Sequence, residues 1–319
     1  MATALRVENL KVYYFTTRGV VKAVDGVSFV VDEGDVLGVA GESGSGKSTL
    51  GYAILGLVPP PGRIVGGRVI LDDIELTALS EDELRKIRWS KVSMVFQGAL
   101  NILNPVMRIG DQMAEILIHH KGVSKEEALK VVREHLRMVG LPLDVVKRYP
   151  HELSGGMKQR VVIAMALLLK PRLVIADEPT TALDVVIQAQ IMNLLKQLKE
   201  EEKLSMIFIT HDLSLIAEIA NKIAIMYAGK IVELGSSEDV YAKPLHPYTQ
   251  SLLNSIPSIK QRKRLSWIPG APPDLRDPPP GCRFHPRCPF AMDVCRREEP
   301  PFIEIEKGHY TSCWLYLKK

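Results

Sequence analysis

The sequence predicts an α/β fold in which a mostly parallel sheet is covered by helices on both faces. Short runs rich in Val, Ile and Phe alternate with longer stretches of helical period, and one of these runs opens into a glycine-rich segment. Two later runs end in polar residues. This alternation is typical of parallel sheets, because their strands are joined by helices and are buried on both faces.

The predicted strands are short and apolar. VLGVAG (residues 36–41), LVIADE (173–178) and MIFITHD (206–212) are each interpreted as a buried strand. IAIMYAG followed by KIVELG (223–235) predicts two strands joined by a turn at Gly229.

Two other regions differ from this core. Residues 104–160 predict a helical subdomain, since Leu, Ile, Glu, Lys and Arg recur there at helical spacing without β-branched runs. Beyond about Ser237 the chain is rich in Pro and polar residues and contains all four cysteines. We therefore expect a core domain at residues 1–236 and a small, irregular C-terminal extension at 237–319.

Composition limits the possible classes of protein. The 319 residues are 46% hydrophobic and carry a net charge of +4. Because no long like-charge block accompanies this mild excess, it argues neither for nor against a nucleic-acid partner. The N-terminus lacks the pattern of a signal peptide. The longest apolar stretch, 161–169, falls short of the ~18 residues of a membrane span. Any work at a membrane is therefore expected to require a partner.

GESGSGKS (residues 41–48) fits the P-loop pattern G-x-x-x-x-G-K-[ST] and follows a predicted strand. The glycines let backbone N–H groups surround phosphate, and a helix starting near Lys47 directs its N-terminus at the anion. Lys47 can reach the β- and γ-phosphates, and Ser48 can ligate Mg²⁺. The alternative, a glycine-rich loop with a chance lysine, is disfavoured by the flanking strand and helix. The loop residues predicted to contact a nucleotide are Gly41, Ser43, Gly44, Ser45, Gly46, Lys47, Ser48 and Thr49.

Two adjacent acids follow the strand LVIAD. Asp177 is predicted at its carboxyl end, where open parallel sheets bind ligands, and can hold Mg²⁺ through water. Glu178 is placed to polarise an attacking water. Either acid alone would be interpreted as a solvated carboxylate, but beside a P-loop they predict a hydrolytic site.

LSGGMKQR (residues 153–160) predicts a second anion site, in which Ser154, Gly155 and Gly156 begin a helix. A simple N-cap and turn is the alternative. With a P-loop about a hundred residues earlier, this motif resembles the signature of the ABC ATPase superfamily. The resemblance implies a P-loop NTPase (RecA-like) core with a helical subdomain, and ATP and Mg²⁺ as cofactors.

The resemblance assigns further residues by motif. Gln97 in MVFQ matches the glutamine that contacts Mg²⁺ and the attacking water, and Asp184 ends the TALD segment that crosses the dimer interface. His211 in ITHD matches the histidine that contacts the γ-phosphate. Tyr14 is expected to stack on adenine, in preference to its neighbours Tyr13 and Phe15. In this superfamily two subunits pair head to tail, so that each ATP lies between one P-loop and the partner's LSGG.

Three segments resemble the peptide-importer branch of the superfamily: FQGALNILNPVMRIGDQ (96–112), LHPYTQSLLNSIP (245–257) and the cysteine-bearing tail. This implies uptake of dipeptides or oligopeptides, with nickel or oligosaccharides as alternative solutes. The implied partners are a second, paralogous ATPase subunit, two transmembrane permease subunits and an external solute-binding protein, with no nucleic acid. The implied location is peripheral, on the cytoplasmic face of the cell membrane.

The four cysteines, Cys282, Cys288, Cys295 and Cys313, leave three alternatives open. Structural zinc usually uses closely spaced pairs, which this sequence lacks, whereas widely spaced thiolates can hold an iron–sulfur cluster. Resemblance to relatives whose tail carries a 4Fe–4S cluster favours the cluster over zinc or no metal. Without metal, we expect reduced thiols packed with Phe284, Phe290 and Trp314.

Two other function classes are weighed against a transporter subunit. ABC ATPases that act on DNA or ribosomes usually carry two cassettes or a long insertion, and this chain has one compact cassette. A module that binds nucleotide without turnover is disfavoured by the presence of both Glu178 and His211.

Overall fold

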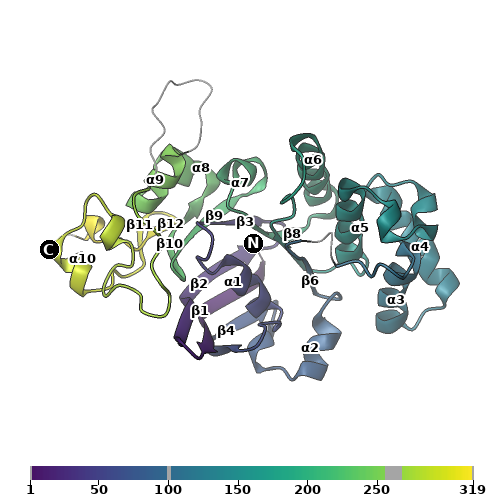
Figure 1. The fold of residues 1–319 in the computed structure, drawn as a ribbon, viewed down its shortest axis with the longest axis horizontal. Coiled ribbons are helices and arrows are strands. Elements are labelled where there is room, and N and C mark those ends of the chain that lie inside the picture. The colour runs from purple at the N-terminus through teal and green to yellow at the C-terminus, as the bar shows by residue number, and fades with distance from the viewer. Residues whose placement is uncertain (1, 99–101, 256–267, 318–319) are drawn as a thin grey trace. The chain divides into compact units, whose positions relative to one another are not determined.

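The computed structural model describes residues 2–98, 102–255 and 268–317 (Figure 1). The chain divides into two compact units. The first consists of Met1–Ala4, Asp32–Gly34 and Ala78–Ile207, and the second contains the remaining residues. Residues 99–101 of the 96–112 segment and residues 256–257 of the 245–257 segment lie outside the described residues.

The first unit contains two parallel strands and most of the long helices. Strand β6 (Val92–Val95) pairs with β7 (Leu173–Asp177) in parallel register, so the predicted strand before Asp177 is confirmed. Every residue of both strands is buried, as a parallel sheet requires. The helices of this unit are α2 (Glu81–Ile87), α3 (Ile109–Lys121), α4 (Lys125–Met138), α5 (Gly155–Leu167) and α6 (Val185–Glu202).

The helices predicted within residues 104–160 are present, and Figure 1 shows α3, α4 and α5 grouped together. Ser124 begins α4 with a capping box, in which its hydroxyl accepts from the Glu127 N–H and the Glu127 carboxylate accepts from the Ser124 N–H. The helix then buries one face, on which Ala128, Val132 and Leu136 follow one another at four-residue spacing.

The second unit contains a four-stranded sheet in the order β2-β1-β4-β5. Its strands are β1 (Thr3–Thr16), β2 (Gly19–Asp32), β4 (Gly62–Leu71) and β5 (Ile74–Glu75), and β4 is antiparallel to both β1 and β5. The sequence did not predict this antiparallel sheet. Buried and exposed positions alternate along much of β1 and β2, the pattern of strands with one solvated face.

A second set of strands in this unit has the order β11-β12-β10-β9-β3. The strands are β3 (Val36–Ala40), β9 (Lys222–Tyr227), β10 (Lys230–Ser236), β11 (Ile303–Glu306) and β12 (His309–Thr311). Only β3 and β9 are parallel, whereas β10 pairs antiparallel with β9 and β12. Parallel pairing of the core strands is therefore confirmed for β3 and β9, and hairpins add the later strands in antiparallel register. The predicted turn at Gly229, with φ 83°, is confirmed. Strand β8 (Ser205–Ile209) contains the boundary between the units.

The C-terminal extension adds ordered elements as well as irregular chain. It contributes α8 (Ser237–Ala242), α9 (Pro247–Asn254), α10 (Asp293–Arg297) and the β11–β12 hairpin. Helices α1 (Lys47–Ile54) and α7 (Leu213–Ile219) complete the second unit. Among the described residues, no helix is long and apolar enough to cross a membrane.

A buried, hydrogen-bonded carboxylate fixes this extension to the sheet. The Glu233 carboxylate of β10 accepts hydrogen bonds from the N–H groups of Leu245 and His246, and it lies 2.8 Å from Nε2 of His309. Glu233 and His309 are both at most 1% exposed. Since a buried carboxylate is stable only when it is fully hydrogen-bonded, these contacts hold the extension in one position on β10.

Candidate nucleotide-binding site

The predicted P-loop connects β3 to α1, as the motif requires. Gly41 and Gly46 have φ values of 153° and 104°. A Cβ atom at Gly41 would lie 2.1 Å from the Met226 carbonyl oxygen, and one at Gly46 would lie 2.0 Å from the Ala23 carbonyl oxygen. Both positions therefore exclude side chains, and the backbone of the loop is set by the strands around it.

The Lys47 ammonium group folds back onto the loop. Its Nζ donates to the carbonyl oxygens of Gly41 and Glu42, at 2.7 and 2.9 Å, and the residue is buried. Ser48 and Thr49 lie in the first turn of α1. The remaining predicted loop contacts, Ser43, Gly44 and Ser45, lie before this helix, with Ser43 and Gly44 exposed and Ser45 buried.

The aromatic residues of β1 have different surroundings, which bear on the choice of Tyr14. Tyr14 Oη lies 3.3 Å from Thr49 Oγ1 at the start of α1. The Tyr13 hydroxyl donates to Asp25 at 2.7 Å, and Phe15 lies under the guanidinium of Arg63. Of the three rings, the structure joins that of Tyr14 to the helix that begins in the P-loop.

In the first unit, Asp177 and Glu178 lie at the end of a strand, as the sequence predicted. Asp177 ends β7 and is fully buried. Glu178 follows with φ 46°, a left-handed conformation that is uncommon outside glycine and is often found at functional sites. Its Oε2 accepts hydrogen bonds from Gln97 Nε2 at 3.0 Å and from Thr181 Oγ1 at 2.8 Å. Gln97 and Glu178 thus meet across 81 residues of sequence.

The LSGG segment begins α5, as predicted. The Ser154 hydroxyl caps the helix by accepting the Met157 N–H at 3.3 Å, so the N-cap interpretation also holds. Gly155 is the first residue of the helix, and a Cβ at Gly156 would lie 2.7 Å from Ile187 of α6. Asp184 caps α6 by accepting the Ile187 N–H at 2.9 Å. Ile187 therefore contacts both the LSGG segment, at Gly156, and the TALD segment, at Asp184.

His211 belongs to the second unit and lies exposed between β8 and α7. The preceding residue is held by a hydrogen bond from the Thr210 N–H to the Val39 carbonyl in β3. Asp212 caps α7 by accepting the Ser214 N–H. The backbone on both sides of His211 is thus fixed while its side chain remains at the surface.

The four cysteines are free thiols within the extension. In the ranges that the structure describes, no three or more Cys, His, Asp or Glu side chains are arranged to hold a metal ion, so the cluster expectation is not confirmed. Burial, with a smaller contribution from neighbouring cysteines, raises the pKa of Cys282 to about 12 and that of Cys313 to about 11. The neutral thiol is therefore the stable form of these two residues at neutral pH.

The aromatic residues expected around the thiols have separate positions. Phe284 is buried against Tyr227 and Tyr248, whereas Phe290 is 53% exposed. Trp314 donates its Nε1–H to the Glu298 carbonyl. Two histidines of the extension are engaged with other groups, since His285 contacts the Cys282 carbonyl and His309 contacts Glu233.

Sequence reasoning missed the contacts that the extension makes with the P-loop. The Glu42 N–H donates to Tyr248 Oη at 2.9 Å, and the Glu42 carboxylate is paired with Arg287. These residues lie 206 and 245 positions apart in the sequence, so no local pattern could have predicted the pairing. A charged residue inside an otherwise glycine- and serine-rich loop was the only available signal.

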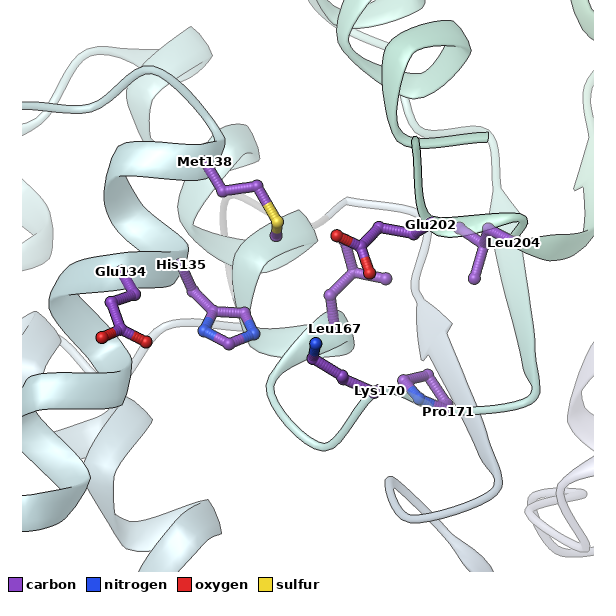
Figure 2. Close-up of a pocket in the computed structure, with 8 residues that line it drawn as sticks. All are labelled: Glu134, His135, Met138, Leu167, Lys170, Pro171, Glu202 and Leu204. Carbon is purple, nitrogen blue, oxygen red and sulfur yellow. The ribbon is translucent and has the colours of Figure 1, made fainter. Parts of the chain in front are cut away.

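A pocket of about 330 Å³ lies elsewhere in the first unit. Figure 2 shows His135 and Met138 of α4 facing Leu167 and Glu202. Its lining is completed by Glu134, Lys170, Pro171 and Leu204, and it includes none of the predicted site residues. The pocket therefore does not belong to the nucleotide motifs.

Comparison with known families agrees with these motifs. Residues 24–181 match the family model described as ABC transporter, and residues 232–295 match that described as oligopeptide/dipeptide transporter, C-terminal region. The chain is 47% identical to the oligopeptide transport ATP-binding protein AppD of Bacillus subtilis, covering 99% of this chain and 98% of that protein. It is 46% identical to the dipeptide transport ATP-binding protein DppD of the same organism, covering 99% and 95%.

Solved structures give the same result for the fold. A dimeric ABC transporter cassette, MJ0796, is 33% identical and covers 73% of this chain and 98% of its own, with a TM-score of 0.66. A post-hydrolysis state of the same cassette, bound to ADP and Pi, is 32% identical and covers 73% and 98%, with a TM-score of 0.64. The fold is thus that of a P-loop NTPase, and the chain belongs to the family of ABC transporter ATP-binding proteins, ATPases of the type that carries the oligopeptide/dipeptide transporter C-terminal region.

Proposed function

We propose that this chain is the ATP-hydrolysing subunit of an importer for dipeptides or oligopeptides. Similarity over nearly the full length to proteins named for oligopeptide and dipeptide transport is the observation that carries the proposal. The match of residues 232–295 to the oligopeptide/dipeptide C-terminal region supports the same solute class. That region includes HPYT (residues 246–249), which lies outside the ATPase motifs.

The roles assigned within the site follow from the chemistry of each group. The P-loop N–H groups and Lys47 bind the β- and γ-phosphates, Tyr14 stacks on adenine, and His211 contacts the γ-phosphate. Glu178 accepts a proton from the attacking water, in the conformation supported by its hydrogen bonds with Gln97 and Thr181.

Mg²⁺ suits the oxygen donors that the motifs provide. Ser48 offers a hydroxyl, Gln97 an amide oxygen and Asp177 a carboxylate, and these are hard ligands of the kind Mg²⁺ prefers. When bound, the ion neutralises charge on the phosphate oxygens. The buried position of Asp177 at the end of β7 fixes its carboxylate for this purpose.

The LSGG segment acts on a partner's nucleotide in this proposal. Ser154, Gly155 and Gly156 present a hydroxyl and N–H groups at the start of α5, and Asp184 begins α6 beside them. The similarity to cassettes solved as dimers supports pairing of two subunits, for which we propose the head-to-tail arrangement of the superfamily. ATP then joins two subunits and hydrolysis separates them. The γ-phosphate thus shifts the equilibrium between the separated and the paired subunits.

The remaining assembly follows from the peptide-importer branch. We assign the chain a peripheral position on the cytoplasmic face of the membrane, with two permease subunits, an external solute-binding protein and a paralogous second ATPase subunit. Residues 1–236 form the ATP-binding domain, with its helical subdomain at about 104–160, and residues 237–319 form the branch-specific extension.

The cysteines are proposed to hold a 4Fe–4S cluster, with zinc or no metal as the alternatives. Support comes from the donor set, because all four cysteines lie within residues 282–313 of the extension and thiolates are the usual ligands of such clusters. Anaerobically purified protein should be brown and contain about four iron atoms per chain, the stoichiometry of such a cluster. If the purified protein contains zinc and no iron, the four cysteines form a zinc site. A colourless, metal-free protein with four free thiols would exclude both the cluster and the zinc site.

Uptake measurements test the proposed function. A strain lacking this gene should lose uptake of labelled dipeptides or longer peptides, and the wild-type gene should restore it. The E178Q variant, expressed to the same level, should not. Unchanged peptide uptake in the deletion strain, with loss of nickel or oligosaccharide uptake instead, would overturn the proposed solute and retain the transporter.

A further inference from the structure

We propose that Arg287 of the cysteine-bearing extension is a positioning residue of the nucleotide site, which holds the P-loop through Glu42. The Arg287 guanidinium donates two hydrogen bonds to the Glu42 carboxylate, at 2.7 and 2.9 Å. Such two-point pairing between planar groups fixes orientation as well as distance. The pair connects the loop that binds phosphate to the segment between Cys282 and Cys288.

Arg287 is itself held firmly. Its side chain is 5% exposed, its Nε donates to the Pro269 carbonyl at 2.8 Å, and its Nη1 lies 3.3 Å from Tyr227 Oη. A buried guanidinium with this many partners cannot turn to solvent when Glu42 moves. The arginine is therefore a fixed anchor, and the P-loop is the part that it restrains.

Glu42 transmits this restraint to Lys47. Three groups of Glu42 are engaged at once, since its N–H donates to Tyr248 Oη, its carboxylate accepts from Arg287, and its carbonyl accepts from Lys47 Nζ. The orientation of the Glu42 peptide therefore sets the position from which the Lys47 ammonium reaches phosphate. Arg287 does not need to touch the nucleotide to affect its binding.

A second arginine of the same segment makes a parallel connection. Arg283 donates to the Ala228 carbonyl and to the Asp25 carboxylate, which also accepts the Tyr13 hydroxyl. Tyr13 precedes Tyr14, the ring assigned to adenine. Burial alone would raise the pKa of Asp25, but the Tyr13 hydrogen bond and the charges of Lys230 and Arg283 outweigh it and lower that pKa. Asp25 thus remains an anionic partner for Arg283.

The core of the segment explains how both arginines are oriented. Phe284 lies between them in sequence and packs against Tyr227 and Tyr248, with ring centroids 5.1 and 5.4 Å apart. These three aromatic side chains are at most 1% exposed. A change in the cysteine-bearing segment that displaced Phe284 would move Arg287 and loosen the P-loop.

The test is a comparison of ATP affinity with turnover in the full-length protein. R287Q should raise both the Kd for Mg–ATP and the KM for hydrolysis by roughly 10-fold, because a charge-assisted pair that orients the loop is lost. The kcat at saturating ATP should stay near the wild-type value. R287K, which keeps the charge but not the two-point geometry, should restore affinity only in part. R276Q, which breaks an exposed pair with Asp274 in the same extension, should change neither constant.

A double-mutant cycle separates positioning from simple loss of stability. E42Q alone should weaken ATP binding as R287Q does, and the double variant should be no weaker than either, because both remove one interaction. If R287Q does not fold, the Kd for Mg–ATP is measured instead in E42Q and Y248F, which remove the carboxylate of Glu42 and the hydroxyl that accepts its N–H. Unchanged Kd in the folded variants, with only a lower melting temperature, or fully additive losses in the cycle, would overturn the proposal.

Discussion

Gln97 Nε2 donates a 3.0 Å hydrogen bond to Glu178 Oε2, and this contact connects the end of β6 with the end of β7. Thr181 supports the same carboxylate oxygen from the other side. The carboxylate is therefore held in one orientation by two hydrogen bonds. This orientation leads to a prediction for Gln97.

Gln97→Ala should lower kcat on the order of 10-fold while leaving the Kd for ATP, measured without Mg²⁺, unchanged. The loss is smaller than the ~10²–10⁴-fold contribution of a general base, because Thr181 still restrains Glu178. Steady-state hydrolysis and equilibrium nucleotide binding measure the two constants. Gln197→Ala, an exposed position of α6, is the matched control. A Gln97→Ala protein with wild-type kcat would show that the contact has no role in turnover.

Mixing two inactive variants tests the composite site. Ser154→Arg blocks the signature segment that serves the partner's ATP, and Glu178→Gln disables the site of its own P-loop. In a mixed dimer both defects fall on one nucleotide, so the second site is intact and hydrolysis should partly return. If each chain completed its own site, the mixture would stay inactive. Where the partner is a paralogue, the same variants are divided between the two chains.

Glu233→Ala should reduce the free energy of unfolding by at least about 1–3 kcal/mol, the usual cost of leaving a buried hydrogen-bonding group unsatisfied. It leaves His309 and the N–H groups of Leu245 and His246 without their shared acceptor. Denaturant unfolding measures the change. Glu306→Ala breaks only an exposed contact with Lys243 and should cost less than about 1 kcal/mol. Equal effects of the two changes would contradict the role given to Glu233.

His246 predicts a loss of stability in acid. Burial lowers its pKa to about 3, and its neutral Nδ1 caps α9 by accepting the Tyr248 N–H. The unfolded imidazole titrates near ~6.5. The unfolded state therefore binds more protons between these values, and the free energy of unfolding falls as the pH drops from about 6.5 towards 3.

His246→Asn should flatten this pH dependence, because asparagine caps a helix without titrating. Unfolding curves at several pH values give the slope. A wild-type slope in His246→Asn would assign the acid sensitivity to other groups.

The parts of the fold that sequence predicted best are those with a local cause. VLGVAG followed by GESGSGKS predicts a strand, a loop and a helix, because glycine and aliphatic residues determine the backbone conformation of their own segment. The structure has β3 and α1 at these positions. The LSGG segment likewise begins α5 through the Ser154 cap. These features needed no knowledge of distant residues.

The antiparallel elements and the contacts of the extension depend on partners far along the chain. In β10, Glu233 is surrounded by apolar residues and carries no sign of its pairing with His309, 76 residues later. The pairing of Glu42 with Arg287 spans 245 residues. Only the folded chain brings such groups together, so the sequence could identify the nucleotide motifs but not the support that the extension gives them.

The most direct test of the account is hydrolysis by Glu178→Gln. Glutamine keeps the size of the side chain and a hydrogen-bond acceptor but cannot take a proton from water. We predict that phosphate release falls by roughly 10²–10⁴-fold while the Kd for Mg–ATP stays at its wild-type value and ATP-dependent pairing of subunits increases. Phosphate release at the wild-type rate by the folded Glu178→Gln protein would contradict the assignment of Glu178 and the mechanism built on it.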